Sequence, residues 1–243
     1  MNATFQEMKN NLMRDYMIRR YQKIVKGEVL IEERAIESLT RMKFQVANSW
    51  RIIIKRALDI SVSLLGLIAC SPVMALVALA VKLDSRGPIL YSQERVGQKG
   101  RTFRIYKFRT MRLDAELKSG PVWAVDNDPR VTAVGHFLRV THLDELPQFF
   151  NVLKGEMSLV GPRPERPHFV KELKKHIPNY DMRLYAKPGV TGLAQIRQRY
   201  DNSIEDVRRK VRYDVLYIKK MCPLLDVKVI ALTALTVILR TGR

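Results

Sequence analysis

Residues 57–83 read ALDISVSLLGLIACSPVMALVALAVKL, a long apolar run with Ser71-Pro72 at its middle. Between Asp59 and Lys82 the run carries no charged residue. A helix that crosses a bilayer needs about 20 mainly apolar residues, so this run is long enough to cross one. The pattern therefore predicts a helix in contact with lipid.

The proline divides the run into two halves. Pro72 removes a backbone donor and disfavours helical geometry at Ser71, whose hydroxyl could satisfy part of the freed backbone. Each half alone would extend only roughly 20 Å, which is too short to span. The flanks are basic on both sides, at Lys55, Arg56, Lys82 and Arg86, whereas a spanning helix usually has its cations on one side. We therefore expect a re-entrant, helix-break-helix membrane segment over residues 51–86, although a kinked spanning helix fits the chain physics equally well.

The chain is strongly basic. Its 243 residues include 43 Lys+Arg and 24 Asp+Glu, which gives a formal net charge of +19. Such a charge indicates an anionic partner, and the apolar run favours anionic membrane lipid, where each nearby cation contributes about 1 kcal/mol. Nucleic acid is not expected, because Trp50 and Trp123 lie far from any basic run that they could interleave with.

The cysteines and the start of the chain indicate the compartment. Cys70 and Cys222 form no disulfide framework and have no metal ligand at zinc spacing. This usage fits a reducing, cytoplasmic setting. Residues 1–30 lack the uninterrupted apolar core of a signal peptide. We therefore expect the protein at the cytoplasmic face of a membrane.

Three segments are predicted. Residues 1–50 show helical spacing of apolar residues and predict an amphipathic extension, either a docking or oligomerisation helix pair or a membrane-surface element. Residues 51–86 are the membrane segment. Residues 87–243 predict an α/β, helix-rich catalytic domain.

Within this domain, strands at 88–93 and around 103–106, joined by a turn at 97–100, predict a short antiparallel hairpin. Helices are expected at 145–153, 164–176, 204–220 and 224–239. The last helix could lie in the membrane interface, as an interfacial amphipathic helix, or pack on the core.

Two adjacent carboxylates, Asp144 and Glu145, lie at a predicted helix start within RVTHLDELPQ (139–148). Acidic residues in a first turn are often simple partners of the helix dipole, and the spacing alone favours that role. Neighbouring residues on a helix point in different directions, so the pair cannot act as two equivalent bases. If the pair is catalytic, one carboxylate attacks or binds substrate and the other holds a divalent cation.

Three basic motifs could bind an anion. In LVGPRP (159–164), Pro162 and the next proline fix the backbone around Arg163, and a rigid guanidinium suits a phosphate. Lys107 and Arg109 flank an apolar residue on a predicted strand. KPGVTG (187–192) is a turn whose backbone amides could approach an anion, although it lacks the spacing of a nucleotide-binding loop. Each motif also has a structural interpretation, as a tight loop, an exposed strand face or an ordinary turn.

Together these residues resemble the bacterial sugar transferases, the monotopic polyprenyl-phosphate phosphoglycosyl transferases. The resemblance covers about four-fifths of the chain. It includes Lys55-Arg56 with Asp59, the Ser71-Pro72 break, YKFRTM (106–111), NDPRVT (127–132), LDELPQ (143–148), NVLKG (151–155), MSLVGPRP (157–164), KPGVTG (187–192) and DVLYIK (214–219). The ERP sequence at 165–167 is similar to that of members serving exopolysaccharide assembly.

The resemblance implies a reaction. Asp144 would attack the β-phosphate of a UDP-sugar, release UMP and carry the phosphosugar until undecaprenyl phosphate accepts it. Glu145 would bind Mg²⁺, and Arg139 would contact phosphate. Less directly, Arg163, Lys107 and Arg109, with Pro162 beside Arg163, carry over as phosphate or nucleotide contacts.

The resemblance also implies a place in surface glycan assembly, at the cytoplasmic face of the bacterial inner membrane. It leaves the sugar and a homo-oligomer open. The alternative is a non-catalytic basic membrane adaptor, which would be indifferent to Mg²⁺ and to both carboxylates.

Overall fold

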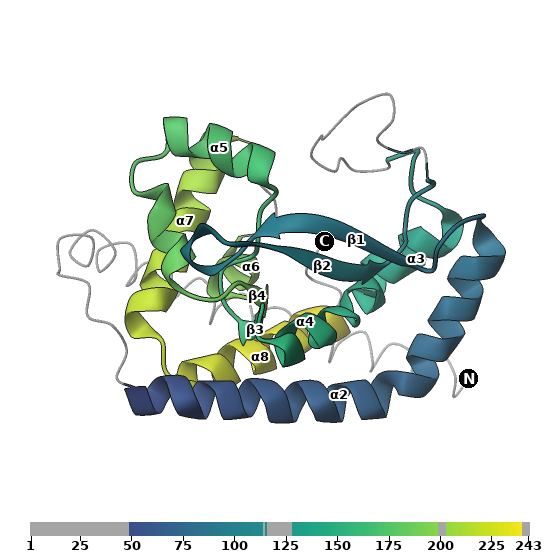
Figure 1. Cartoon of the computed structure of the whole chain (residues 1–243), viewed down its shortest axis with the longest axis horizontal. Helices are drawn as coiled ribbons and strands as arrows, with labels where there is room; N and C mark the ends of the chain where they lie inside the picture. The colour runs from purple at the N-terminus through teal and green to yellow at the C-terminus, as the bar shows by residue number, and fades with distance from the viewer. Residues whose placement is uncertain (1–48, 114, 116–127, 199–202, 240–243) are drawn as a thin grey trace, which may run out of the picture.

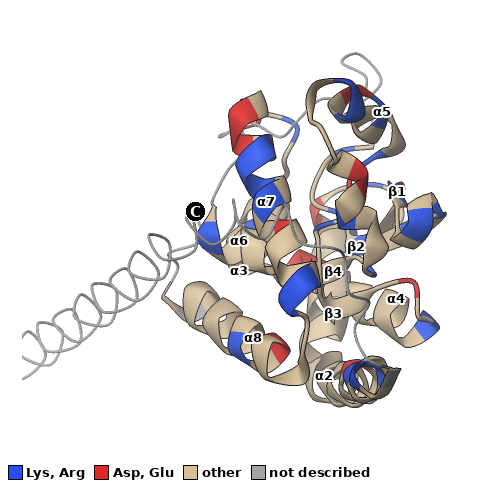
Figure 2. Ribbon diagram, turned by 90° about the vertical axis from the view of Figure 1, so that its left-hand side faces the viewer, with Lys and Arg blue, Asp and Glu red and all other residues tan. Residues whose placement is uncertain are grey.

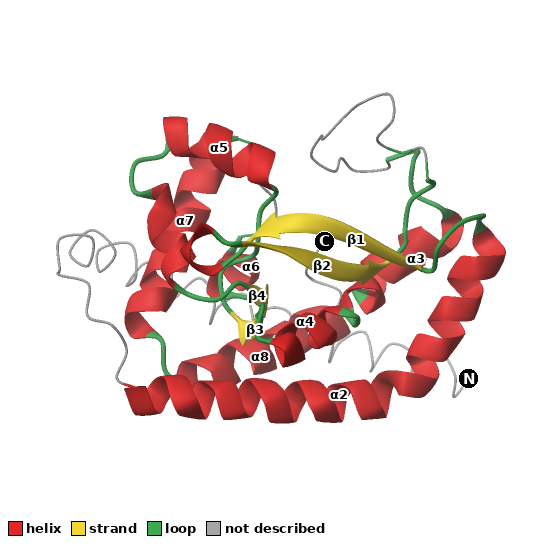
Figure 3. Ribbon diagram, viewed as in Figure 1, coloured by secondary structure: helices red, strands yellow, loops and turns green. Residues whose placement is uncertain are grey.

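The computed structural model describes residues 49–113, 115, 128–198 and 203–239. Nearly all of the expected N-terminal extension, residues 1–50, lies outside this part of the chain. The long helix α2 (Ser49–Asp84) runs along one side of the molecule, and the other elements lie on the same side of it (Figure 1). Helices dominate, and the strands form two small sheets of two strands each (Figure 3).

Helix α2 is continuous through Ser71 and Pro72, so the expectation that Pro72 removes Ser71 from helical geometry is wrong. Figure 1 shows that the helix bends rather than breaks. Pro72 cannot donate to Ile68 O four residues back, and the Ser71 hydroxyl donates to that carbonyl instead at 2.8 Å. Ser71 therefore satisfies a group that the proline frees, but it fills a gap in one helix and does not cap a second.

Protein covers little of α2. The helix is long and apolar enough to cross a membrane, and 11% of its most apolar stretch is buried. Its exposed side chains include Ile53, Leu65, Leu76 and Leu83. The core helix of a soluble protein would be mostly buried, so this surface is best explained by contact with lipid.

Both ends of α2 are tied to the same domain. Near the start, Lys55 Nζ pairs with Asp226 at 2.8 Å, and Asp59 accepts a hydrogen bond from Ser158 Oγ at 3.0 Å. These polar side chains are buried. Near the end, Val81 packs in a cluster with β2 and α3. The Lys55-Arg56 and Asp59 motif is thus where α2 docks on the domain.

The predicted hairpin is present. Strands β1 (Leu90–Val96) and β2 (Thr102–Phe108) pair antiparallel, with Gln93 opposite Ile105. The short 3-10 turn η1 (Gln98–Gly100) joins them, and its left-handed residues include Gly100, which a tight turn favours. The first strand begins two residues later than predicted.

A parallel strand pair was not predicted. Strands β3 (Ser158–Val160) and β4 (Gly189–Thr191) have three residues each and pair Ser158 with Gly189. A Cβ on Gly161 or Gly189 would collide with the backbone of the other, so glycine is required by close backbone approach. The KPGVTG motif therefore forms part of a strand pair and not an amide-lined anion turn.

The remaining helices are α3 (Ala133–Thr141), η2 (Leu143–Glu145), α4 (Gln148–Lys154), α5 (Pro167–His176), η3 (Tyr180–Tyr185), α6 (Leu193–Arg197), α7 (Ile204–Lys220) and α8 (Pro223–Ile238). The predicted helices at 204–220 and 224–239 are confirmed to within one residue. The helix predicted at 145–153 is instead the turn η2 followed by α4, with Pro147 between them. The helix predicted at 164–176 begins at Pro167, because Arg166 precedes a proline and is extended.

The core lies between β2, β3 and helices α4, α6, α7 and α8. Its fully buried members include Val152, Met157, Tyr217 and Val229. Figure 2 shows α8 alongside α2, with few charged residues on α8. Val229 of α8 is buried, while Leu224 is 80% exposed, so α8 packs on the core and also presents an apolar outer face.

Candidate functional site

Asp144 and Glu145 lie in η2, a single 3-10 turn between α3 and α4. His142, which precedes the turn, is left-handed with φ 58° and redirects the chain after α3. Pro147 then begins α4. This geometry turns the acidic pair inward, and Asp144 is only 6% exposed.

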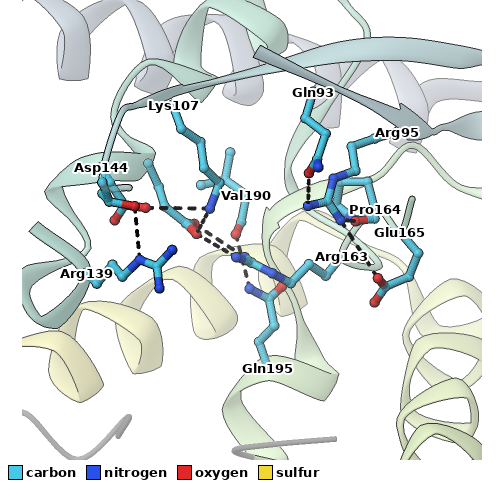
Figure 4. Close-up of polar contacts among 12 residues, drawn as sticks. Gln93, Arg95, Lys107, Arg139, Asp144, Arg163, Pro164, Glu165, Val190 and Gln195 are labelled. Atoms are coloured by element: carbon cyan, nitrogen blue, oxygen red, sulfur yellow. Dashed lines mark hydrogen bonds and ion pairs between the residues drawn. The ribbon is translucent and has the colours of Figure 1, made fainter. Parts of the chain in front are cut away.

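Two cations from distant elements hold Glu145 (Figure 4). Lys107 Nζ, from β2, donates to Glu145 Oε1 at 2.7 Å. Arg163 Nη2, from the loop after β3, donates to the same oxygen at 2.6 Å, and Arg163 Nη1 reaches Oε2 at 3.3 Å. The structure therefore brings Lys107 and Arg163 to the acidic pair.

Asp144 is bonded very differently. Its carboxylate has one ion pair, with Lys107 Nζ at 3.7 Å. No hydrogen bond reaches it from the described residues. A buried carboxylate with this much unused bonding capacity is free to bind or attack a substrate.

The environments separate the pair electrostatically. Burial raises the pKa of Asp144, Lys107 opposes that rise, and the charge of Glu145 adds to it. Burial alone would also raise the pKa of Glu145, but Arg163 and Lys107 outweigh it and hold the pKa well below the usual range. The surroundings thus lower the pKa of Glu145 and raise that of Asp144, and such a separation of two neighbouring pKa values is typical of acid pairs in active sites.

The helix-dipole interpretation explains less. The turn η2 has three residues, so it provides little dipole, and Glu145 binds side chains from two remote elements. A simple first-turn acid needs no such partners.

Arg139 lies in the last turn of α3, and its Nε donates to Thr110 Oγ1 at 3.0 Å. Figure 4 draws it on the Asp144 side of the site. Its predicted contact with a substrate phosphate stays a prediction.

Arg109 is not brought to the acidic pair. It is buried, and its guanidinium donates to Arg86 O at 2.6 Å and to Ser85 O at 2.7 Å, at the end of α2. Both terminal nitrogens therefore donate to backbone carbonyls just beyond the end of α2. This geometry supports a structural role at the helix end in place of the predicted phosphate contact.

Hydrogen bonds to its backbone carbonyls hold the loop that carries Arg163, on the side away from the acidic pair. Pro162 O accepts from Gly189 N at 3.0 Å, and Arg95 Nη1 donates to Pro164 O at 3.1 Å. Arg183 Nη2 donates to Arg163 O at 2.9 Å. The prolines and these bonds together fix the direction of the Arg163 side chain.

Behind the loop lies a second charge network. Arg183 pairs with Asp214 at 2.8 Å, and both are almost fully buried. Lys210 pairs with Glu165 at 2.9 Å. Burial would raise the pKa of Glu165, but Lys210 and then Arg183 lower it to about 2. Sequence reasoning missed this network, because no local pattern marks Arg183 and its partners lie far along the chain.

The acidic pair can be tested for its fit to Mg²⁺. Among the residues that the structure describes, no group of three or more His, Cys, Asp or Glu side chains could hold a metal ion. Mg²⁺ is often bound by one or two carboxylates together with water and substrate phosphates. Asp144 and Glu145 fit that kind of site, in which the metal arrives with a diphosphate.

The chain also has clear relatives. Residues 50–240 match the family model described as bacterial sugar transferase. Over 189 residues the chain is 44% identical to the UDP-N-acetylgalactosamine-undecaprenyl-phosphate N-acetylgalactosaminephosphotransferase of Aeromonas hydrophila, which covers 78% of this chain and 44% of that protein. Over 188 residues it is 44% identical to the UDP-glucose:undecaprenyl-phosphate glucose-1-phosphate transferase of Klebsiella pneumoniae, covering 76% of this chain and 40% of that one.

A third relative is the undecaprenyl-phosphate glucose phosphotransferase of Komagataeibacter xylinus, 42% identical over 201 residues that cover 81% of this chain and 38% of that protein. The chain thus spans less than half the length of these three relatives. The sequence motifs and the family match agree, and the chain belongs to the bacterial sugar transferase family.

Proposed function

We propose that this protein transfers a sugar 1-phosphate from a UDP-sugar to undecaprenyl phosphate, through a covalent intermediate on Asp144. The observation that carries the proposal is the contrast within the acidic pair: Glu145 is clamped by two cations, while Asp144 is buried and receives no hydrogen bond from the described residues. The names of the relatives support undecaprenyl phosphate as acceptor.

In the first displacement, a carboxylate oxygen of Asp144 attacks the phosphorus that bears the sugar. The new bond joins that oxygen to phosphorus, and the bond to the bridging oxygen breaks. UMP leaves with the electron pair, so no proton has to be moved. The product is an acyl phosphate between Asp144 and the sugar.

In the second displacement, a phosphate oxygen of undecaprenyl phosphate attacks the same phosphorus. The bond to Asp144 breaks, and the free carboxylate is restored. The product is undecaprenyl diphosphate sugar. Two displacements at one phosphorus replace a single direct transfer between two anions.

Repulsion between anions is the main barrier, and the cations around the pair oppose it. Lys107 Nζ lies 2.7 Å from Glu145 and 3.7 Å from Asp144, so it can stabilise charge as the nucleophile and phosphate approach. Arg163 presents a planar guanidinium suited to phosphate oxygens. Glu145 is the carboxylate that would hold Mg²⁺, which when bound would neutralise charge on the diphosphate.

The way α2 is docked supports a re-entrant placement in the cytoplasmic leaflet. Lys55 ties the start of α2 to the domain, and Arg109 ties its end to the same domain. A hydrocarbon core is about 30 Å thick, so one domain cannot hold both ends from opposite sides without crossing the bilayer itself. The bend in α2 (Figure 1) would let the apolar middle dip and return.

Cysteine labelling tests this topology. Single cysteines placed at residues 53 and 85, in a cysteine-free background, should react with an impermeant reagent from the same side of sealed vesicles. Labelling from opposite sides would overturn the re-entrant placement.

Trapping the intermediate tests the reaction. Purified protein is mixed with a UDP-sugar that carries ³²P in its β-phosphate, with Mg²⁺ and without lipid acceptor, and then quenched. Label should stay on the wild-type protein, be absent from Asp144→Asn, and be chased off by undecaprenyl phosphate. Turnover without label on the protein, with a ternary-complex rate law, would argue for direct transfer.

A further inference from the structure

Two cations converge on Gly155, the residue that ends α4. Arg56 comes from α2, and Lys187 comes from the segment just before β4. A Cβ built on Gly155 would lie 3.5 Å from Arg56 Nη2 and 3.5 Å from Lys187 Nζ. The two nitrogens are therefore at most twice that distance apart.

The end of α4 accounts for Arg56. Its guanidinium donates to Val152 O at 2.6 Å and to Leu153 O at 2.9 Å, two carbonyls of the last helical turn. A cation at a helix C-terminus is a common stabilising arrangement. Arg56 therefore needs no ligand to explain its position.

Lys187 is not explained in this way. Among the described residues its ammonium makes no hydrogen bond and no ion pair. Burial lowers the pKa of Lys187, and the neighbouring Arg56 lowers it further. The carboxylate of Asp59 partly offsets this by raising the pKa of Lys187, but its Oδ1 already accepts hydrogen bonds from Ser158 and Leu159.

A half-buried ammonium beside a guanidinium carries an electrostatic cost that a bound anion would relieve. The position of the pair indicates where that anion comes from. Ile52, Ile53 and Ile54, which precede Arg56 on α2, are all exposed. The cations thus lie at the level where the lipid-facing surface of α2 begins.

We propose that Arg56 and Lys187, with Gly155 between them, bind the phosphate group of a membrane lipid, at a site separate from the Asp144–Glu145 pair. This inference rests on the membrane placement in the proposed function. The recognised chemistry is a phosphate ester anchored in lipid, either a bulk anionic phospholipid or the polyprenyl phosphate acceptor. Gly155 has φ +84°, so a side chain there would be strained as well as placed against both cations.

The site adjoins the catalytic loop through the backbone. Gly189, two residues after Lys187, donates its N–H to Pro162 O at 3.0 Å, next to Arg163. A lipid phosphate held by Lys187 would therefore be bound two residues before the strand that contacts the Arg163 loop.

The experiment compares Lys187→Gln with Lys171→Gln, which removes the same charge from an exposed position on α5. Full-length protein is bound to phosphatidylcholine vesicles with and without phosphatidylglycerol, and KM for undecaprenyl phosphate is measured. Lys187→Gln should weaken binding to the anionic vesicles, or raise the KM for the lipid acceptor, by about fivefold. Lys187→Arg should restore either value, and Lys171→Gln should change neither.

The vesicle binding and the KM for undecaprenyl phosphate together identify the source of the phosphate. A loss on phosphatidylglycerol vesicles assigns the site to bulk phospholipid, and a raised KM alone assigns it to the acceptor. If Lys187→Gln changes neither value, the proposal is overturned. Because the ammonium of Lys187 has no hydrogen bond or ion pair to lose within the part of the chain that the structure describes, its substitution should not lower Tm, which separates a binding effect from misfolding.

Vesicle binding needs no turnover, so its failure leaves the transferase proposal untouched. Absence of a trapped Asp144 adduct, in turn, leaves the vesicle result intact.

Discussion

Asp144 and Asp214 are both buried, and burial raises the pKa of each above the ordinary value. Their partners differ completely. Asp214 accepts from Arg183 Nε at 3.0 Å and pairs with Arg183 Nη2 at 2.8 Å, while the one ionic partner of Asp144 among the described residues is Lys107, at 3.7 Å. A raised pKa alone therefore does not mark a reactive carboxylate in this molecule, whereas unused hydrogen-bonding capacity does.

The same contrast separates the two charge networks on either side of residues 162–166. Behind the loop, Glu165, Lys210, Arg183 and Asp214 are paired with one another. In front of it, the cations bond Glu145 and leave Asp144 available. The paired network holds the backbone, and the proposed function places the substrate at the front network.

The largest expected effect tests the comparison between Asp144 and Asp214 directly. Asp144→Asn should reduce kcat by at least about 10³-fold, since a nucleophile is lost. It should not reduce Tm. The pKa of Asp144 is higher in the folded than in the unfolded protein. The protonated carboxyl therefore contributes stability that is fully present below the unfolded pKa and is lost as pH rises through the folded pKa. At neutral pH the ionised carboxylate carries a cost in stability, which asparagine removes.

Asp214→Asn is the matched variant. It leaves Arg183 buried without its acid, which should cost about 3–5 kcal/mol of unfolding free energy. Thermal denaturation and turnover of the two variants check the pair of expectations. An Asp144→Asn protein that unfolds as readily as Asp214→Asn would mean that both aspartates are structural.

A smaller effect is expected at the clamp on Glu145. Arg163→Lys keeps the charge but loses the two-pronged contact, whose distances are 2.6 and 3.3 Å. Loss of a charge-assisted bond of about 1.5–3 kcal/mol predicts a fall in kcat/KM of about 10- to 100-fold. Arg101→Lys, on the exposed hairpin turn, is the control. Equal activity in both variants would show that the fork geometry is not used.

A pH profile sharpens the electrostatic side of the comparison. The nucleophile must be ionised, so kcat/KM should fall as pH drops through the pKa of Asp144, at a pH above the usual aspartate value of 3.8. Lys107 lowers that pKa, and Lys107→Gln should therefore move the acidic limb to higher pH. A limb that stays in place after the substitution would remove Lys107 from contact with the nucleophile.

Much of the fold could be predicted because it depends on local patterns. The apolar run predicts α2, the alternation around Phe103 predicts β2, and helical spacing predicts α7 and α8. The spacing of the acidic pair alone favoured a helix-dipole role, and the family resemblance is what implied a catalytic one.

The remaining features depend on contacts between distant residues. Strands β3 and β4 have three residues each, and 28 residues separate them in the sequence. Strands this short show no periodicity from which they could be predicted. Arg183 and Arg109 could not be assigned from sequence, because their roles are set by carbonyls and carboxylates that only the fold brings near. Continuity of α2 at Pro72 was missed because the proline was expected to break the helix, whereas the Ser71 hydroxyl bonds Ile68 O within one continuous helix.

The smallest expected effect tests whether the Ser71 hydroxyl keeps α2 continuous. As with the two aspartates, the question is whether a polar group, here the Ile68 carbonyl, has a hydrogen-bond partner. Ser71 Oγ donates to Ile68 O, the carbonyl that Pro72 cannot reach. Ser71→Ala should cost about 0.5–1.5 kcal/mol, measured as thermal stability in nanodiscs. In a Pro72→Ala background, where the backbone N–H returns to Ile68 O, the same substitution should cost nearly nothing. The cost of Ser71→Ala differs between the two backgrounds only if the serine hydroxyl replaces the hydrogen bond that the proline removes. Equal costs would mean that the hydroxyl contributes to stability in some other way and that another interaction supports the bend in α2.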